Sequence, residues 1–522
     1  MFLRGFISAL ITFVVMTGSL AQSQVADSLF RASDLFYFSP LERESFGLYF
    51  DGKPDYFKMI IAVNENSAEN DIEIYRDWIG DIVQEIRHPK FDRLSSAKKI
   101  NQVQSKVNKT LLTSYEHQSG FMDVFRAGKY NYYTAASVYA LIFDQLRIPY
   151  EIREVSNSVL LLAYPYNERI PVEIEGPGSM FFAFAHDTRS SFVEFLRDSE
   201  VIDNATFSST PTRILFERYY FADYGLTIRE MIGMLYLNSA IDYLNRSEPD
   251  NAYRQFEKAY ILYPSSKTQY MLLAHLNGFL ISMDYTDLRD LGYLIKASRL
   301  IGSGVDRDRI AAYLQDIVQE VLVNDQDLKQ MEYIRNYLQD YIADEGLMRD
   351  FDFQYYYETG MVHFNDEQYF NALTSFETAY SLKPDDKNNQ NFLTRALGGY
   401  SINTNPGMVL EKINHYDTAF LEILDNEIYL AVKQHVCLEF FGEAFQLQDS
   451  RNGERYMAIF EEMVEQYPEI RVNFLAIGRS YSSAAIYYYR QGQVKKSREI
   501  LEKGLKYAPQ NIELKLKLKS FE

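Results

Sequence analysis

The chain contains 522 residues, of which 47% are hydrophobic and 24% are charged, a composition typical of a globular protein. Its 53 Lys and Arg residues against 72 Asp and Glu residues give a formal net charge of −19. An acidic surface repels phosphate backbones and anionic lipids, so neither nucleic acid nor an anionic membrane surface is an expected partner. The length predicts about two to four domains.

The first 21 residues have the features of a secretory signal peptide. Arg4 precedes an apolar run from Phe6 to Val15, and the small residues Ser19 and Ala21 suit cleavage after Ala21. The alternative, a membrane anchor, is disfavoured because a spanning helix needs about 20 apolar residues. No later stretch is apolar enough to span, so the sequence predicts an exported protein, periplasmic or secreted, without a transmembrane segment once mature.

Residues 25–215 combine helical and strand patterns. Up to residue 125, apolar residues recur mostly at helical spacing, and after it β-rich runs alternate with turn residues. We therefore predict an α+β domain, completed by a helix over 134–146, strands over 148–155, 159–164 and 170–174, and a helix over 190–199.

Within this domain, residues 130–173 resemble the core of the transglutaminase-like (papain-like) fold. The resemblance rests on the helical run TAASVYALIF, the turn LRIP and the strand SVLLLAYP. Tyr132 stands where that family has its nucleophilic Cys, Ser158 stands where it has its His, and Glu173 best matches its acid. The resemblance implies the fold of the family for residues 25–215, with the Cys–His pair lost.

A relocated nucleophile is the alternative for chemistry in this domain. Thr134 or Ser158 with His186 would be the candidates, because a hydroxyl needs a nearby base to become a nucleophile. The seven histidines are not spaced as metal ligands, and the chain has no glycine-rich phosphate loop, C-x-x-C or HExxH motif. We therefore expect no cofactor and no metal. The only cysteine, Cys437, cannot form an intrachain disulfide and is expected to be buried and inert.

Residues 225–522 read as helices throughout and contain a repeated pattern. Small residues, an aromatic or Leu, and a closing Pro recur with identical offsets in three segments, and this spacing is that of tetratricopeptide repeats. The pattern predicts a solenoid of about six to eight helical hairpins. Together with the N-terminal resemblance, the chain is similar to exported bacterial proteins that join a transglutaminase-like domain to such repeats. The three segments are Ala240–Pro264, Gly360–Pro384 and Ala485–Pro509.

The first helices of these hairpins would line a concave groove. Its side chains are apolar or aromatic, which favours an apolar segment of a peptide or a partner helix as ligand. The alternative, that packing within the chain covers these side chains, stays open because exposed apolar patches are normally small. The groove candidates are Leu237, Ile241, Leu244, Tyr357, Met361, Phe364, Ile486 and Tyr489.

These patterns predict a mainly α protein, made of a degenerate transglutaminase-like α+β domain followed by an all-α repeat domain. The predicted function is an exported, non-catalytic scaffold or binding protein for a protein, peptide or envelope component. A hydrolase or acyl transferase with a relocated nucleophile is the alternative. The sequence does not indicate an oligomeric state.

Overall fold

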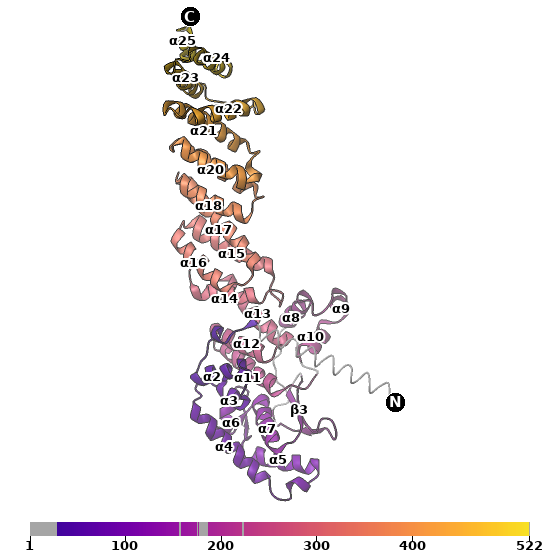
Figure 1. Cartoon of the computed structure of the whole chain (residues 1–522). Helices are drawn as coiled ribbons and strands as arrows, with labels where there is room; N and C mark the ends of the chain where they lie inside the picture. The colour runs from indigo at the N-terminus through magenta and orange to yellow at the C-terminus, as the bar shows by residue number, and fades with distance from the viewer. Residues whose placement is uncertain (1–28, 156–157, 175, 177–185, 222–223, 521–522) are drawn as a thin grey trace. The chain divides into compact units, whose positions relative to one another are not determined.

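The structure is a computed structural model that describes residues 29–155, 158–174, 176, 186–221 and 224–520 (Figure 1). The predicted signal peptide, residues 1–21, lies outside the described residues. None of the helices in the described part of the chain is both long and apolar enough to cross a membrane. The chain divides into two compact units, Met1–Met283 with Arg299–Asp306 and Asp284–Ser298 with Arg307–Glu522. The division predicted between residues 215 and 225 falls inside the first unit.

The first unit contains all five strands of the described residues, in two small sheets. Strands β1 and β2 form a parallel pair, while β3, β4 and β5 form an antiparallel sheet in that order. The elements are η1 (Ala32–Asp34), α2 (Pro40–Phe50), α3 (Tyr56–Ala62), α4 (Glu69–Ile86), η2 (Phe91–Arg93), α5 (Ser96–Thr110), β1 (Ser114–Tyr115), α6 (Phe121–Ala127), β2 (Lys129–Tyr130), α7 (Tyr132–Leu146), β3 (Tyr150–Val155), β4 (Ser158–Ala163), β5 (Ile170–Val172), α8 (His186–Asp198), α9 (Asn204–Ser209), α10 (Thr212–Tyr220), α11 (Ile228–Asn245), α12 (Pro249–Leu262) and α13 (Ser266–Ile281).

The predicted α+β transglutaminase-like domain over residues 25–215 is wrong. The β-rich runs do form strands, but these are short and make only a three-stranded and a two-stranded sheet, while most of the described residues in this segment are helical. The three-stranded sheet is too small to form a layer of its own. Helix α7 covers it, and α11, which lies outside the predicted domain, packs against α7. The broader prediction of a mainly α protein is confirmed.

Helix α7 begins and ends where local chemistry dictates. The Asn131 side chain accepts hydrogen bonds from the backbone N–H groups of Tyr133 and Thr134, which would otherwise lack partners at the helix start. The helix ends at Arg147, whose φ of 56° lies in the left-handed region. Nearly all of α7 is buried, so it forms the centre of the unit.

Two buried ion pairs join segments of the first unit that are far apart in the sequence. Lys258 Nζ on α12 lies 2.6 Å from a carboxylate oxygen of Glu42 on α2. Lys267 Nζ on α13 lies 2.5 and 2.6 Å from the two carboxylate oxygens of Glu154 on β3. Burial lowers the pKa of both lysines, and the facing carboxylate opposes the shift. Helices α12 and α13 are therefore held to the N-terminal elements by charge as well as by packing.

The second unit is entirely helical within the described residues, apart from its connecting loops. Successive helices contact their neighbours in the chain, as in α17 with α18, α21 with α22 and α23 with α24. Its elements are α14 (Leu288–Arg299), α15 (Arg307–Ile317), the π-helical turn η3 (Val318–Asn324), α16 (Leu328–Tyr341), α17 (Glu345–Asn365), α18 (Tyr369–Leu382), α19 (Lys387–Ile402), α20 (Pro406–Ala419), η4 (Leu421–Ile423), α21 (Glu427–Gln446), α22 (Ser450–Gln466), α23 (Phe474–Arg490), α24 (Val494–Tyr507) and α25 (Ile512–Lys519).

The three segments with the repeated pattern each form a pair of packed helices: α11–α12, α17–α18 and α23–α24. The small residues of the pattern allow close approach. A Cβ atom placed on Gly360 of α17 would lie 2.6 Å from the ring of Phe376 on α18. The prediction that Cys437 on α21 is buried is confirmed, and burial raises the pKa of this free thiol to about 12.

Candidate binding site

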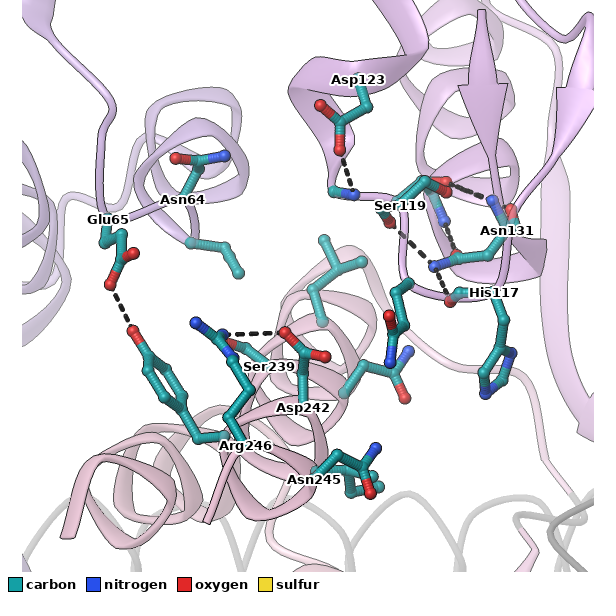
Figure 2. A pocket seen from close by; sticks show the side chains of 18 of the residues that line it. Asn64, Glu65, His117, Ser119, Asp123, Asn131, Ser239, Asp242, Asn245 and Arg246 are labelled. Atoms are coloured by element: carbon teal, nitrogen blue, oxygen red, sulfur yellow. Dashed lines mark hydrogen bonds and ion pairs between the residues drawn. The ribbon is translucent and has the colours of Figure 1, made fainter. Parts of the chain in front are cut away.

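A polar pocket of about 390 Å³ lies in the first unit, between segments that are distant in the sequence (Figure 2). The loop after α3 and the loop between β1 and α6 form two of its walls, together with the start of α7. The C-terminal half of α11 forms the remaining wall. The volume suits a small ligand or a few residues of a chain.

Side-chain amides dominate this pocket. Asn131 is committed to the fold, because its Nδ2 atom donates to the carbonyl oxygens of His117 and Ser119 and thereby holds the loop in place. Four other side-chain amides make no hydrogen bond within the described residues. One is that of Asn66 in the loop after α3, and the other three, of Gln118 in the loop after β1 and of Asn238 and Asn245 on α11, are available to a ligand.

The charged groups of the pocket are already partnered. Asp242 and Arg246 form an ion pair on α11 at 2.8 Å, and Asp123 accepts a hydrogen bond from the Gly120 N–H. Glu65 accepts a hydrogen bond from Tyr243 on α11. Figure 2 marks these contacts with dashed lines. Three carboxylates against one guanidinium make the pocket acidic, so it repels an anionic ligand.

Tyr243 is held in its neutral form. Burial raises the pKa of its phenol, and the hydrogen bond and negative charge of Glu65 raise it further. The guanidinium of Arg246 lies 4.4 Å from the centre of the Tyr243 ring. Tyr243 is thus a fixed hydrogen-bond donor to Glu65 and fixes the position of the loop after α3 against α11.

Tyr132, which stands at the position matched to the catalytic Cys, is buried in the protein. It is the first residue of α7, with its ring centre 5.1 Å from that of Tyr115. A Cβ atom added to Gly176 would lie 2.5 Å from the Tyr132 hydroxyl, so the backbone at Gly176 packs directly on this ring. Glu173 is exposed beyond the end of β5.

The relocated-nucleophile candidates are only partly described. The Thr134 hydroxyl borders the polar pocket, but it accepts a hydrogen bond from the N–H of Asn131 and donates one to the carbonyl oxygen of the same residue. Ser158 begins β4 and His186 begins α8, and the side chains of both lie outside what the structure describes. Of the three candidates, Thr134 is therefore the one whose side chain is described, and its hydroxyl is hydrogen-bonded to the backbone at the start of α7.

The groove candidates are divided between the two units. Leu237, Ile241 and Leu244 belong to the first unit, where Leu237 is buried and Ile241 lines the polar pocket. The others belong to the second unit. Three of them, Tyr357, Met361 and Phe364, are half-buried and pack against its hydrophobic core, whereas Ile486 and Tyr489 on α23 are 39% and 57% exposed.

Sequence reasoning did not find the pocket. Its residues come from four segments between residues 63 and 246, and no motif connects them. The available signal was the pair Asn238 and Asn245, two amide side chains seven positions apart on α11, a spacing that places them on one face of the helix. Within the described residues, no group of His, Cys, Asp and Glu side chains could hold a metal ion. No protein-family model matches the chain, and no curated protein sequence is similar to it.

Proposed function

We propose that the chain is an exported, non-catalytic binding protein whose polar pocket holds a small, uncharged, hydroxyl-rich ligand such as a saccharide of the cell envelope. The observation that carries the proposal is the set of unpaired amides of Gln118, Asn238 and Asn245 in an acidic pocket. A carboxamide both donates and accepts hydrogen bonds, as a sugar hydroxyl does.

Other ligand classes fit this pocket less well. An apolar ligand would strip water from the three amides without replacing its hydrogen bonds, which costs about 1–3 kcal/mol for each group. A phosphate or carboxylate ligand would face Glu65, Asp123 and Asp242, with only Arg246 in compensation, and Arg246 is already paired. A neutral polyol avoids both costs.

The test is calorimetric titration of the purified protein with neutral oligosaccharides and with their phosphorylated counterparts. We expect binding of a neutral sugar and weaker or no binding of the phosphorylated form. Asn238→Leu and Asn245→Leu should each weaken binding by about three- to tenfold. The control is Asn414→Leu on α20, an exposed helical asparagine of the second unit far from the pocket residues in sequence. Tight binding of a phosphorylated sugar, insensitive to both α11 variants, would contradict the proposal.

The non-catalytic part of the proposal has its own test. A serine-directed activity probe should leave the folded protein unlabelled, because the Thr134 hydroxyl is engaged in the cap of α7. Labelling that Ser158→Ala or His186→Ala abolishes would instead establish the hydrolase or acyl-transferase alternative.

A further inference from the structure

The last helix of the chain, α25, has two apolar faces and uses only one of them. Leu514 is fully buried and Leu518 packs against the core of the second unit. Ile512 and Leu516, one helical turn apart, are 71% and 64% exposed. The outer face of α25 therefore exposes two large apolar side chains that no described residue covers.

This exposed stripe borders a hollow. A pocket of about 740 Å³ lies between the starts of α23 and α25, and Ile512 forms part of its wall. Phe474 and Leu475, the first residues of α23, form the facing wall and are 64% and 73% exposed. Asn511 fixes the two helices together, since its Nδ2 atom donates to the Phe474 carbonyl oxygen at 2.8 Å. The surface is thus preformed and concave.

The same end of the chain is basic. Residues 494–520 contain eight Lys and Arg residues against three Glu residues, in a chain whose net charge is −19. Three of the α24 lysines are neutralised by glutamates of α22. Lys515 and Lys519 on α25 have no carboxylate partner within the described residues. Each follows one of the two apolar residues of the stripe by three positions, so uncompensated positive charge lies along one side of the exposed apolar side chains.

We propose that this surface, formed by Phe474, Leu475, Ile512 and Leu516 with Lys515 and Lys519, docks an acidic segment of another protein that carries two apolar anchors. The hollow accepts the anchors and the lysines pair with the carboxylates of the segment. The surface is separate from the polar pocket, so this proposal does not depend on the function assigned to that pocket.

A second copy of the chain and a membrane fit the surface less well. Two α25 helices packed antiparallel about the middle of their apolar stripes would bring Lys515 of one copy near Lys515 of the other, and like charges repel. An anionic lipid surface would match the charge, but it is broad and cannot fill a hollow between two helix starts. A peptide side chain can fill it.

The test is fluorescence anisotropy of the full chain with a labelled synthetic peptide that has Phe and Leu four residues apart and Glu at the intervening positions. The comparison peptide has Lys in place of every Glu. We expect the acidic peptide to bind at least about tenfold more tightly, and the difference to shrink at high salt. Equal binding of the two peptides, or no binding of either, would overturn the proposal.

Variants locate the contact. Lys515→Glu with Lys519→Glu should weaken acidic-peptide binding about tenfold or more, and Ile512→Gln with Leu516→Gln should abolish it. The controls, Lys495→Glu on α24 and Ile402→Gln on α19, change an exposed lysine and a 78% exposed isoleucine elsewhere in the unit and should have no effect. Circular dichroism establishes that each variant is folded.

Two further measurements decide between partners. Sedimentation velocity should show no self-association through this surface, and vesicles of phosphatidylserine and phosphatidylcholine should not bind the chain. Dimers that Ile512→Gln with Leu516→Gln dissociates, or vesicle binding that these changes abolish, would replace the peptide with a second copy or a membrane. Either result would overturn the proposal.

Discussion

Lys267→Met tests the buried ion pair that fixes α13 to β3. The change keeps most of the apolar stem and removes the ammonium group that lies within 2.6 Å of both Glu154 carboxylate oxygens. Among the described residues, the side-chain donor that remains near the Glu154 carboxylate is the Tyr133 hydroxyl at 3.5 Å, too long to compensate. The ammonium also lies 5.1 and 5.6 Å from the ring centres of Tyr220 and Tyr263, and these cation–π contacts disappear with it.

Removing one member of a buried ion pair leaves an uncompensated charge and costs about 3–5 kcal/mol. A typical protein has a total unfolding free energy of about 5–15 kcal/mol, so this loss is a large fraction of the whole. For a unit of this size, the melting temperature should fall by on the order of 10 °C. Urea unfolding followed by circular dichroism measures the free energy, and the slope of the transition shows whether the unfolded state has changed.

A double-mutant cycle identifies the cause. Lys267→Met with Glu154→Leu removes both charges and should recover most of the stability, because apolar pairs replace buried ion pairs at little or no cost. Lys129→Met removes a half-exposed lysine from its pair with Glu116 and should have much less effect. If Lys267→Met is no more harmful than Lys129→Met, or if the double variant is less stable than either single one, the reasoning from uncompensated charge is wrong.

Three further outcomes are expected. Burial raises the pKa of Tyr260 to about 12 from its ordinary 10.0, so stability that is complete below pH 10 should be lost as pH rises toward 12, measured by tyrosinate absorbance together with circular dichroism. Asn131→Ala removes the cap of α7 and two hydrogen bonds to the loop, and should cost about 2 kcal/mol in urea unfolding. Gly360→Ala should lower the free energy of unfolding, because the cost of overpacking against Phe376, about 1–3 kcal/mol, exceeds the gain in helix propensity of about 1 kcal/mol. Gly292→Ala, which has open space around it, should raise the free energy of unfolding.

Local elements of the first unit could be read from the sequence. The helix predicted over 134–146 is α7, and the three β-rich runs became β3, β4 and β5 to within about two residues at each end, within the usual boundary error. The spacing of apolar residues predicts these helices and strands because each forms from residues that are close together in the chain. The fold class failed because it depends on how large the sheet grows and on which distant helices cover it. The α+β prediction extended three short strands into a layer that the chain does not build.

The polar pocket was beyond sequence reasoning for the same reason. Asn64 and Asn245 both line it, yet 181 positions separate them in the chain. Helix α11 is apolar on most sides, so its pattern indicates burial and not which neighbour covers each side. Leu237 and Ile241 were predicted to line a groove from repeat geometry alone. The structure buries Leu237 and places Ile241 in the wall of a different cavity.

The first predicted repeat is therefore part of the N-terminal unit and not merely the start of an array. Helix α11 supplies a wall of the polar pocket, while α12 and α13 supply Lys258 and Lys267 to buried carboxylates. A fragment ending near residue 215 would keep Glu42 and Glu154 but lose both lysines, leaving two acids without their partners in the core. The pocket and the stability of the unit thus depend on the same three helices. The α11–α12 hairpin, which the sequence pattern indicates as part of a peptide groove, instead completes the fold of the first unit.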